Sequence, residues 1–339
     1  MIGWLGIIGR KLSFLLVLVI LMISATNILL CNEYNFARVT YFGFIDNLKI
    51  YVVYDNNAYR EDLMASWGLS LYIEAGNTTI LFDTGGDGKI LLSNMKKLGL
   101  NPKNVDIVVI SHIHSDHLGG LYDFLKVNPN VTVYIPNGFP DDVVEHIKSY
   151  GVVVKPLPGP AIIAKGVLST GGLETDIGLY EQSLVINTTK GLVILSGCAH
   201  PGIDRIVEKI VEITGYDKIL LVGGGFHLAG VSDDRIIKII NTFKRYHVEY
   251  VMPIHCSGDR ARELFHEHWG EHCILAGVGY VLDIDNLPSR NNINNLGVKG
   301  SINNSGTQIY PIRGYLMVLL IAIVLATITV LIVRIRRKH

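Results

Sequence analysis

Cysteine is scarce in this sequence, which has 4 cysteines in 339 residues, at positions 31, 198, 256 and 273. No two of them form a Cys-x-x-Cys pair, and four scattered thiols cannot hold a large domain together as a disulfide framework. A small disulfide-stapled fold is therefore excluded, and a packed apolar core must supply the stability.

Net charge is lacking as well, because 30 basic residues balance 30 acidic ones. The sequence has no block of like charges other than the basic C-terminal segment Arg-Ile-Arg-Arg-Lys-His, which adjoins an apolar run. Because the protein has no net positive charge to attract a polyanion, we expect no nucleic-acid partner. Only 18% of the residues are charged and 49% are hydrophobic, which is too apolar for an ordinary soluble domain of this length.

Two long apolar runs, residues 12–30 and 315–333, account for this composition. Each has about the length that a helix needs to cross a bilayer. Small residues at Ser24 and Ala25 also suit a cleavage point, so residues 1–31 are predicted to be either a membrane anchor or a signal segment. Residues 314–334 are predicted to form a C-terminal transmembrane helix.

Basic residues flank the outer end of each run: Arg10 and Lys11 precede the first, and the basic C-terminal segment follows the second. The positive-inside tendency then places both ends of the chain in the cytoplasm and everything between them outside. We therefore predict a cell-membrane location, with the membrane as a partner and the catalytic domain extracytoplasmic. Residues 286–313, rich in Asn, Gly and Ser, are predicted to be a flexible linker.

The middle of the chain, residues 45–285, alternates short apolar β-rich runs with amphipathic stretches. Residues 106–110 and 192–195 are typical of buried strands, and residues 203–214 of a helix. The alternation predicts one α/β domain with sheets in the middle and helices outside. Residues 136–175, which contain several prolines and a glycine pair, are predicted to form loops over the site.

A histidine-rich segment, His-Ile-His-Ser-Asp-His at 112–117, follows the strand predicted at 106–110. His112 and His114 point the same way in an extended segment and can share one metal ion. Asp116 and His117 then turn toward the next helix, where they can hold a second ion. Three imidazoles and a carboxylate next to a buried strand would be costly without partners, and metal ions remove that cost.

Three later histidines also follow apolar strands in short glycine-bearing turns. They are His200 in Gly-Cys-Ala-His-Pro-Gly, His227 in Gly-Gly-Gly-Phe-His-Leu and His255 in Pro-Ile-His-Cys-Ser-Gly. Functional residues concentrate at such strand ends in α/β folds. We expect these histidines to join the 112–117 segment in one site.

The motifs together resemble the metallo-β-lactamase superfamily, and more narrowly its dihydropterin-ribofuranosylaminobenzene-phosphate synthase-like branch. The motifs are YDNNA at 54–58, SWGLS at 66–70, ILFDTG at 80–85, SHIHSDHLGGL at 111–121, GCAHPGI at 197–203, GGFHL at 224–228 and HCSG at 255–258. The resemblance implies an αββα sandwich over residues 49–282. With the apolar runs, the predicted fold class is an α/β metallo-β-lactamase fold flanked by transmembrane helices.

The resemblance also implies a ligand set for two divalent metal ions. The ligands for the first ion are His112, His114 and His200, and those for the second are Asp116, His117 and His255. Asp83 resembles the residue that orients the ligand imidazoles of this loop without itself binding a metal ion. Nitrogen-rich ligands favour zinc, with iron or manganese as alternatives.

One departure from the superfamily pattern concerns the Asp that bridges both ions in many two-metal members. No Asp stands at an equivalent strand end here, and His227 is the residue in place. An imidazole does not bridge as a carboxylate does, so His227 is predicted to ligate one ion or to contact the substrate. Cys198 and Cys256 lie beside presumed ligands. Thiolate ligation is one alternative for them, and the family pattern favours a place behind the ligands or a packing role.

Hydrolysis follows as the predicted chemistry, because ions of this kind activate water as hydroxide at neutral pH. Asp116 is expected both to bind metal and to accept a proton, and His227 to assist catalysis. The predicted function is a membrane-tethered, outward-facing dinuclear hydrolase that acts on a small-molecule ester, lactone, amide or phosphoester. A synthase-like enzyme of pterin assembly and a non-catalytic metal-binding module are the alternatives.

Overall fold

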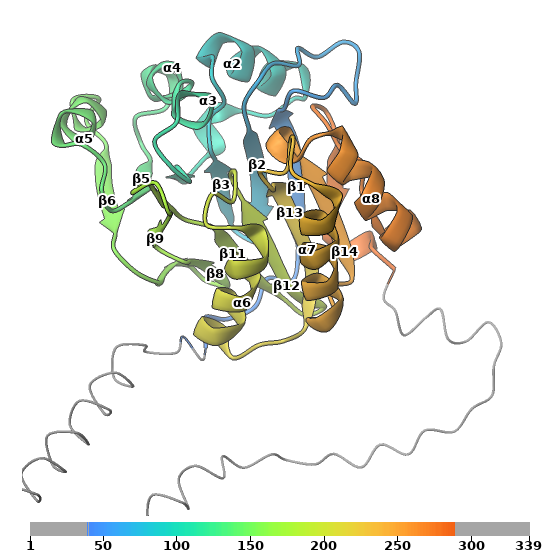
Figure 1. The fold of residues 1–339 in the computed structure, drawn as a ribbon. Helices are drawn as coiled ribbons and strands as arrows, with labels where there is room; N and C mark the ends of the chain where they lie inside the picture. The colour runs from blue at the N-terminus through green and yellow to red at the C-terminus, as the bar shows by residue number, and fades with distance from the viewer. Residues whose placement is uncertain (1–38, 40, 289–339) are drawn as a thin grey trace, which may run out of the picture. The chain divides into compact units, whose positions relative to one another are not determined.

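Two mixed β-sheets form the centre of the molecule in the computed structural model, which describes residue 39 and residues 41–288 (Figure 1). The seven-stranded sheet has the order β15-β1-β2-β3-β4-β5-β6, and the six-stranded sheet has the order β14-β13-β12-β11-β8-β7. The first sheet consists of β1 (Leu48–Tyr54), β2 (Ser70–Ala75), β3 (Thr78–Phe82), β4 (Ile107–Val109), β5 (Thr132–Pro136), β6 (Val153–Leu157) and β15 (Val281–Asp283). The second consists of β7 (Ala161–Ala164), β8 (Val167–Ser169), β11 (Leu184–Thr188), β12 (Gly191–Ser196), β13 (Ile219–Gly225) and β14 (Tyr250–Ile254).

Each sheet combines an antiparallel part with a parallel part. In the first sheet, β15, β1, β2 and β3 pair antiparallel and β3 to β6 pair parallel. In the second sheet, β12, β13 and β14 are parallel and the remaining pairs are antiparallel. A separate antiparallel pair, β9 (Leu173–Glu174) with β10 (Tyr180–Glu181), precedes β11.

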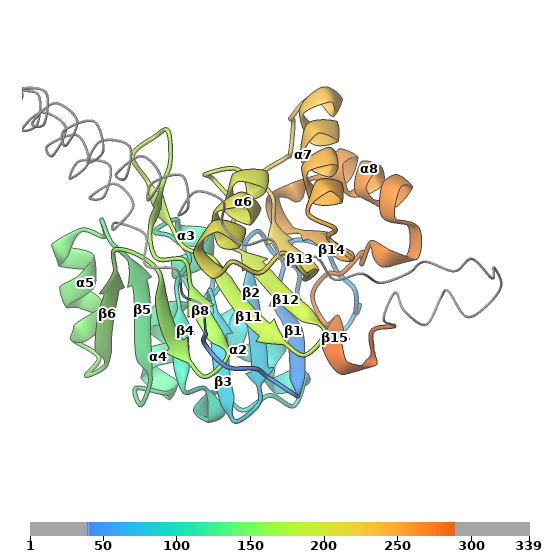
Figure 2. The same ribbon diagram turned by 90° about the horizontal axis from the view of Figure 1, so that it is seen from below.

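Helices cover the outer faces of both sheets, as Figures 1 and 2 show. Those on the first sheet are α2 (Gly88–Lys97), α4 (Leu121–Val127) and α5 (Asp141–Lys148), with the short α3 (Ser115–Leu118) before α4. Those on the second sheet are α6 (Ile203–Thr214), α7 (Asp233–Arg245) and α8 (Asp259–Trp269).

Strand residues alternate between two apolar layers. In β3, Ile80 and Phe82 belong to the core between the sheets, whereas Leu81 faces the helices of the first sheet. In β12, Val193 lies between the sheets and Ile194 faces the helices of the second sheet. Successive side chains of a strand point to opposite faces, so a strand that is apolar throughout needs cover on both sides. The result is the predicted αββα arrangement.

Helix α6 shows how the sequence determines such an element. Its buried residues include Ile203, Ile206, Ile210 and Ile213, which recur at helical spacing on one face. The helix ends at Gly215, whose φ of +71° is the left-handed conformation that glycine adopts readily at a helix end. The prediction of a helix over residues 203–214 is confirmed.

The prediction that residues 136–175 form loops over the site is wrong for much of this range. Strands β6, β7 and β8 lie within it, and they complete the two sheets. Strand β6 contains Pro156, which lacks an N–H, and it lies at the edge of its sheet, where proline is tolerated. Pro158 and Pro160 lie in the short connection between the edge strands β6 and β7.

The predicted membrane segments require a correction. Within residue 39 and residues 41–288, no helix is both long enough and apolar enough to cross a bilayer. The predicted N-terminal segment 1–31, the C-terminal helix 314–334 and nearly all of the linker 286–313 lie outside the described residues. The finding contradicts the predicted cell-membrane location with an extracytoplasmic domain, which we do not retain.

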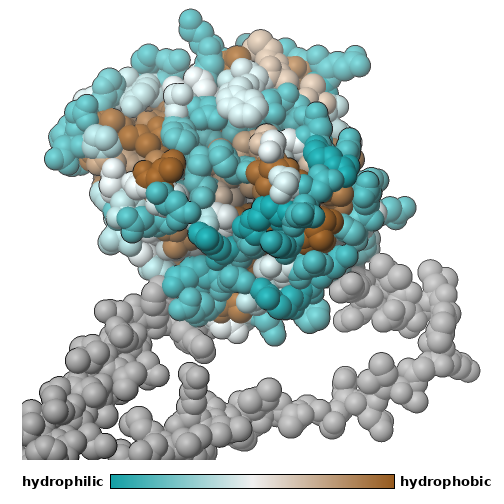
Figure 3. All heavy atoms as spheres, in the orientation of Figure 1, coloured by the Kyte–Doolittle hydropathy of each residue, from teal (hydrophilic) through white to brown (hydrophobic). Residues whose placement is uncertain are grey.

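The surface of the described domain agrees with its amphipathic helices. The face in Figure 3 is mainly hydrophilic and carries only small, separate apolar patches. This is the pattern expected when helices turn an apolar stripe to the sheets and a polar face to water.

Candidate metal centre

The predicted site residues come together at the carboxyl ends of parallel strands from both sheets. The 112–117 segment follows β4, and His200 lies in the loop after β12. His227 and His255 follow β13 and β14. Side chains that are up to 138 residues apart in the chain thereby meet within hydrogen-bonding distance.

The first group of donors is His112, His114 and His200, whose candidate ligand atoms all lie within 4.8 Å of one another. His112 Nε2 and His114 Nδ1 are 3.0 Å apart. The ring centroids of His112 and His114 lie 4.7 Å and 4.9 Å from that of His200. These are the three residues predicted for the first ion.

The second group is Asp116, His117 and His255, again the predicted set. The two Nε2 atoms are 3.2 Å apart, and Asp116 Oδ2 lies 3.6 Å from His117 Nε2 and 3.4 Å from His255 Nε2. Ligands about 2.0–2.1 Å from a tetrahedral zinc ion lie about 3.3 Å from each other. The three donor atoms therefore already have the spacing of one coordination sphere.

Asp83 and Ser111 determine which ring nitrogens of two histidines are free. Asp83 accepts hydrogen bonds from the Ser111 N–H, the Ser111 hydroxyl and His117 Nδ1, at 2.6, 2.7 and 2.7 Å. Because the Ser111 hydroxyl hydrogen points to Asp83, Ser111 Oγ accepts from His112 Nδ1, 2.9 Å away. Both histidines then carry a lone pair on Nε2, which is the form that binds metal.

Glu181 orients His200 in a similar way. This fully buried carboxylate accepts from His200 Nδ1 at 2.8 Å and from the backbone N–H groups of Cys198, Ala199 and His200 at 2.7–2.8 Å. The predictions from sequence did not include Glu181. Its segment, at the start of an apolar strand, has no motif that distinguishes it from an ordinary turn carboxylate.

Asn56 and Asp55 orient His255. Asn56 donates from Nδ2 to the His255 carbonyl, so its Oδ1, 3.0 Å from His255 Nδ1, is the acceptor. The buried Asp55 accepts the His255 N–H at 2.8 Å. These residues were also not predicted as site residues, although they belong to the YDNNA motif that supported the resemblance.

The donor set fits divalent cations. His117 and His255 each donate through Nδ1, so two lone pairs face each other across 3.2 Å, an arrangement that a shared cation stabilises. Burial, with added repulsion from neighbouring histidines, lowers the pKa of His112 and His117 to about 3, so both are neutral. Burial opposes ionisation of Asp116, but the imidazoles of His255 and His117 beside it outweigh burial and hold its pKa below the ordinary range.

Backbone strain is concentrated at the same site. Among the described residues, five that are not glycine have positive φ, and four of them belong to the site loops. These four are Asp83 (+58°), Ala199 (+60°), His227 (+53°) and His255 (+51°). Such conformations cost about 1–3 kcal/mol each and persist where the surroundings enforce them, often at functional sites.

His227 lies on the exposed side of the first group. Its ring centroid is 4.5 Å from that of His200, and its candidate ligand atom groups with those of His200 and Cys198 but with none of the second group. His114 and His227 are exposed, whereas His112, His117 and His255 are buried. The two predicted roles of His227, as a ligand to one ion or as a substrate contact, are both consistent with this position.

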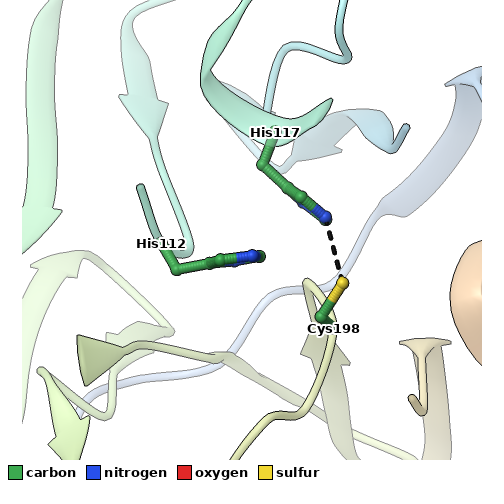
Figure 4. A group of neighbouring side chains, drawn as sticks. All are labelled: His112, His117 and Cys198. Atoms are coloured by element: carbon green, nitrogen blue, oxygen red, sulfur yellow. Dashed lines mark hydrogen bonds between the residues drawn. The ribbon is translucent and has the colours of Figure 1, made fainter. Parts of the chain in front are cut away.

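Cys198 lies between the two groups. Figure 4 shows its side chain pointing toward His112, from the loop after β4, and His117, on α3. The Cys198 Sγ is 3.1 Å from His117 Nε2 and 3.3 Å from the Cys256 Sγ. A packing role alone does not account for a sulfur that faces the candidate ligand nitrogens, whereas the two other roles considered from sequence, thiolate ligation and a place behind the ligands, both remain open.

Comparison with known proteins agrees with this architecture. The family model of the metallo-β-lactamase superfamily matches residues 68–200. The chain is 33% identical, over 276 residues, to the 7,8-dihydropterin-6-methyl-4-(β-D-ribofuranosyl)-aminobenzene-5'-phosphate synthase of Methanocaldococcus jannaschii, covering 68% of this chain and 94% of that enzyme. An uncharacterised protein of the same organism, MJ0448, is 30% identical over 62% of this chain and 91% of its own length.

A solved structure extends the likeness to the fold. Tm1679, a metal-dependent hydrolase of the β-lactamase superfamily, is 29% identical and superposes with a TM-score of 0.59. The match covers 70% of this chain and 99% of Tm1679. The catalytic fold as a whole is therefore common to the two chains.

Proposed function

Because the chain belongs to the metallo-β-lactamase superfamily, in the branch of the dihydropterin-ribofuranosylaminobenzene-phosphate synthase, we propose that it is a two-metal-dependent hydrolase of a small-molecule ester, lactone, amide or phosphoester. The observation that carries the proposal is the spacing of Asp116, His117 and His255, at 3.2–3.6 Å, beside a second group of three imidazoles. The hydrolase Tm1679, with 29% identity, supports the reaction class.

Two divalent ions, with zinc favoured by the nitrogen-rich donors, would supply an activated water and a Lewis acid for the scissile bond. His112 Nε2, His114 Nδ1 and His200 would hold one ion, and Asp116 Oδ2, His117 Nε2 and His255 Nε2 the other. The side chains of the protein hold the protons and contact the substrate.

The protein holds protons at defined atoms and leaves others free. Asp83, Ser111, Glu181 and the Asn56 amide keep protons on Nδ1 of four histidines, which leaves their Nε2 atoms unprotonated. These four are His112, His117, His200 and His255. Asp116 is ionised and only partly buried, so it can accept a hydrogen bond from the attacking water and orient it.

His227 is suited to the substrate side of the site. It is exposed, it lies beside His200, and its ring can donate a hydrogen bond to an oxygen that gains negative charge in the transition state. Its Cys256 neighbour raises the pKa of His227, which favours the donor form.

The test of this proposal combines metal analysis with a substrate panel. The purified full-length protein is assayed against carboxylic esters, lactones and phosphodiesters, with metal content measured on the same samples. We expect about two ions per chain and hydrolysis of one class, with His114→Ala and His255→Ala each losing metal and activity. His266→Ala, on the exposed face of α8, is the matched control and should keep both.

A full metal complement in both His114→Ala and His255→Ala would contradict the ligand assignment. Two bound ions without hydrolysis of any class on the panel would contradict the reaction class and leave the metal centre intact.

The second candidate is a synthase of the pterin-linked kind, and the observation in its favour is 33% identity spanning 94% of the Methanocaldococcus jannaschii synthase. Incubation with ribofuranosylaminobenzene phosphate and a 7,8-dihydropterin that carries a leaving group on its 6-methyl carbon distinguishes the two, because the new bond forms as that group departs. Formation of the joined product favours the synthase, and its absence together with hydrolysis of a panel substrate favours the hydrolase.

A further inference from the structure

The sulfur of Cys198 is within reach of donors from both metal groups. Its Sγ lies within 4.8 Å of candidate ligand atoms of His112 and His200 in the first group and of His117 and His255 in the second. The distance to His117 Nε2 is 3.1 Å, as the dashed line in Figure 4 marks. A nitrogen and a sulfur bound to one tetrahedral zinc ion lie about 3.5 Å apart, so only a small adjustment separates this contact from shared coordination.

The backbone around Cys198 brings the sulfur to this place. A Cβ on Gly197 would lie 2.1 Å from Ser111 Oγ, so only glycine lets this loop pass against Ser111. The Cys198 N–H is held by Glu181 Oε1 at 2.8 Å, and the next residue, Ala199, has a strained φ of +60°. The same carboxylate that orients His200 therefore also positions the thiol.

Cys256, the other thiol nearby, is differently placed. Its Sγ accepts the backbone N–H of His227 at 3.3 Å, and its candidate ligand groups include only Cys198 and His255. It therefore contacts the second group alone, through one histidine. The thiol of Cys198 faces the unprotonated Nε2 of His117, to which its S–H can donate when no metal is bound.

Charge also favours an additional anionic ligand. Three imidazoles, which carry no negative charge, form the first group, and Asp116 is the single carboxylate among the six donors of both groups. Two divalent cations carry four positive charges, which Asp116 and the buried carboxylates Asp83 and Glu181 behind the ligands do not balance in full. The superfamily's bridging aspartate has no counterpart at the strand ends of this sequence.

We propose that Cys198 is a seventh metal ligand, a thiolate between the two ions that stands in for the missing bridging carboxylate. The proposal rests on the two-metal function proposed above. On coordination the S–H bond breaks, a metal–sulfur bond forms and the proton passes to solvent. A thiolate among the ligands favours binding of zinc or cobalt over manganese or magnesium.

Cobalt substitution tests this directly, because Co²⁺ bound to a thiolate absorbs in the near ultraviolet by sulfur-to-metal charge transfer and Co²⁺ bound only to nitrogen and oxygen does not. The full-length protein is loaded with Co²⁺, and metal content is measured with the spectrum. We expect about two ions per chain and a charge-transfer band. The zinc form should show a sulfur shell at about 2.3 Å in X-ray absorption.

The variants separate Cys198 from the other thiols. Cys198→Ser should lose the band, and Cys198→Asp should lose the band while it still binds two ions, because its carboxylate can take the same place. Cys256→Ser should keep the band, and so should Cys273→Ser, the matched control away from the site.

Several results would overturn the proposal. Two bound cobalt ions without a band in the wild type would remove thiolate ligation but leave the two-metal function standing. A band that survives in Cys198→Ser and disappears in Cys256→Ser would assign the ligand to Cys256. Failure of the wild type to bind any metal would overturn this proposal and the proposed function together.

Discussion

Glu181 shows how one buried side chain can position a candidate metal ligand, His200, that lies 19 residues away in the chain. It accepts hydrogen bonds from the ring of His200 and from three successive backbone N–H groups. Burial opposes its ionisation, but the hydrogen bond with His200 and the nearby His112 outweigh burial and hold its pKa below the ordinary range. The ionised form of Glu181 is therefore the one that accepts these hydrogen bonds.

Glu181→Gln should weaken binding of the first ion about 10- to 100-fold, the usual effect of removing a partner behind a metal-binding histidine. The amide replaces one acceptor oxygen with an N–H₂ group that faces other donors. Calorimetric titration of the metal-free protein measures the loss. Glu174→Gln, on the exposed strand β9 beside it, is the control, and equal affinities in the two variants would contradict the role of Glu181.

Cys273 gives a pH-dependent prediction away from the metal centre. Burial raises the pKa of its thiol to about 12. At pH 9 the thiolate fraction in the folded protein is then about one in a thousand, whereas a free thiol with a pKa of about 8.5 is mostly ionised. Alkylation of Cys273 should therefore stay slow in the folded protein between pH 7 and pH 9.

Mass spectrometry of the peptide that contains Cys273 follows this reaction, with the denatured chain as the control, whose labelling should rise steeply over the same pH range. Equal rates in the folded and denatured protein would show that burial does not protect the thiol.

At the level of elements, the helices and central strands were predictable because their patterns are local. Helix α6 has its apolar residues at helical spacing and a glycine at its end, and the strand before His112 is apolar throughout. The short strands β6, β7 and β8 were not predictable, because proline and glycine in this range indicate turns and because a partner strand elsewhere in the chain decides the outcome.

The residues of the candidate site also fall into those that the sequence predicts and those that it does not. The ligand histidines were predictable because they form a motif or follow apolar strands. Glu181 and Asn56 were not assigned roles, because their partners, His200 and His255, approach them only through the packing of the two sheets. The position of Cys198 between the groups likewise depends on how the loop after β12 passes Ser111.

Helix α6 also yields a stability prediction. Ile210 is fully buried between this helix and the second sheet, so Ile210→Ala should lower the free energy of unfolding by about 2–5 kcal/mol. Urea denaturation measures the change. Glu212→Ala, on the exposed side of the same helix, should change stability by about 0.5 kcal/mol or less. A similar small effect of both variants would mean that α6 contributes little to the core.

At the scale of the whole molecule, metal removal should destabilise the fold, because ligands from both sheets lose their common partner. A free ion at 100 times its dissociation constant stabilises the folded state by about 2.7 kcal/mol per site. For a domain of this size that is about 5–10 °C in Tm.

Differential scanning calorimetry with and without a chelator measures the shift. Zinc should restore the original Tm, and magnesium should not, because these donors are mainly nitrogen. An unchanged Tm after verified metal loss would show that the two sheets hold together without the ions.

The Asp83–Ser111 contact has a consequence for how the two ions bind. One carboxylate accepts a hydrogen bond from His117 of the second group and, through Ser111 Oγ, orients His112 of the first. Burial, the largest influence on this carboxylate, raises its pKa to about 7. If two ions bind as proposed, the first would favour the charged carboxylate and so orient both imidazoles, including the one that it does not contact. Binding of the two ions would then be positively cooperative, each raising the affinity of the other by the same factor.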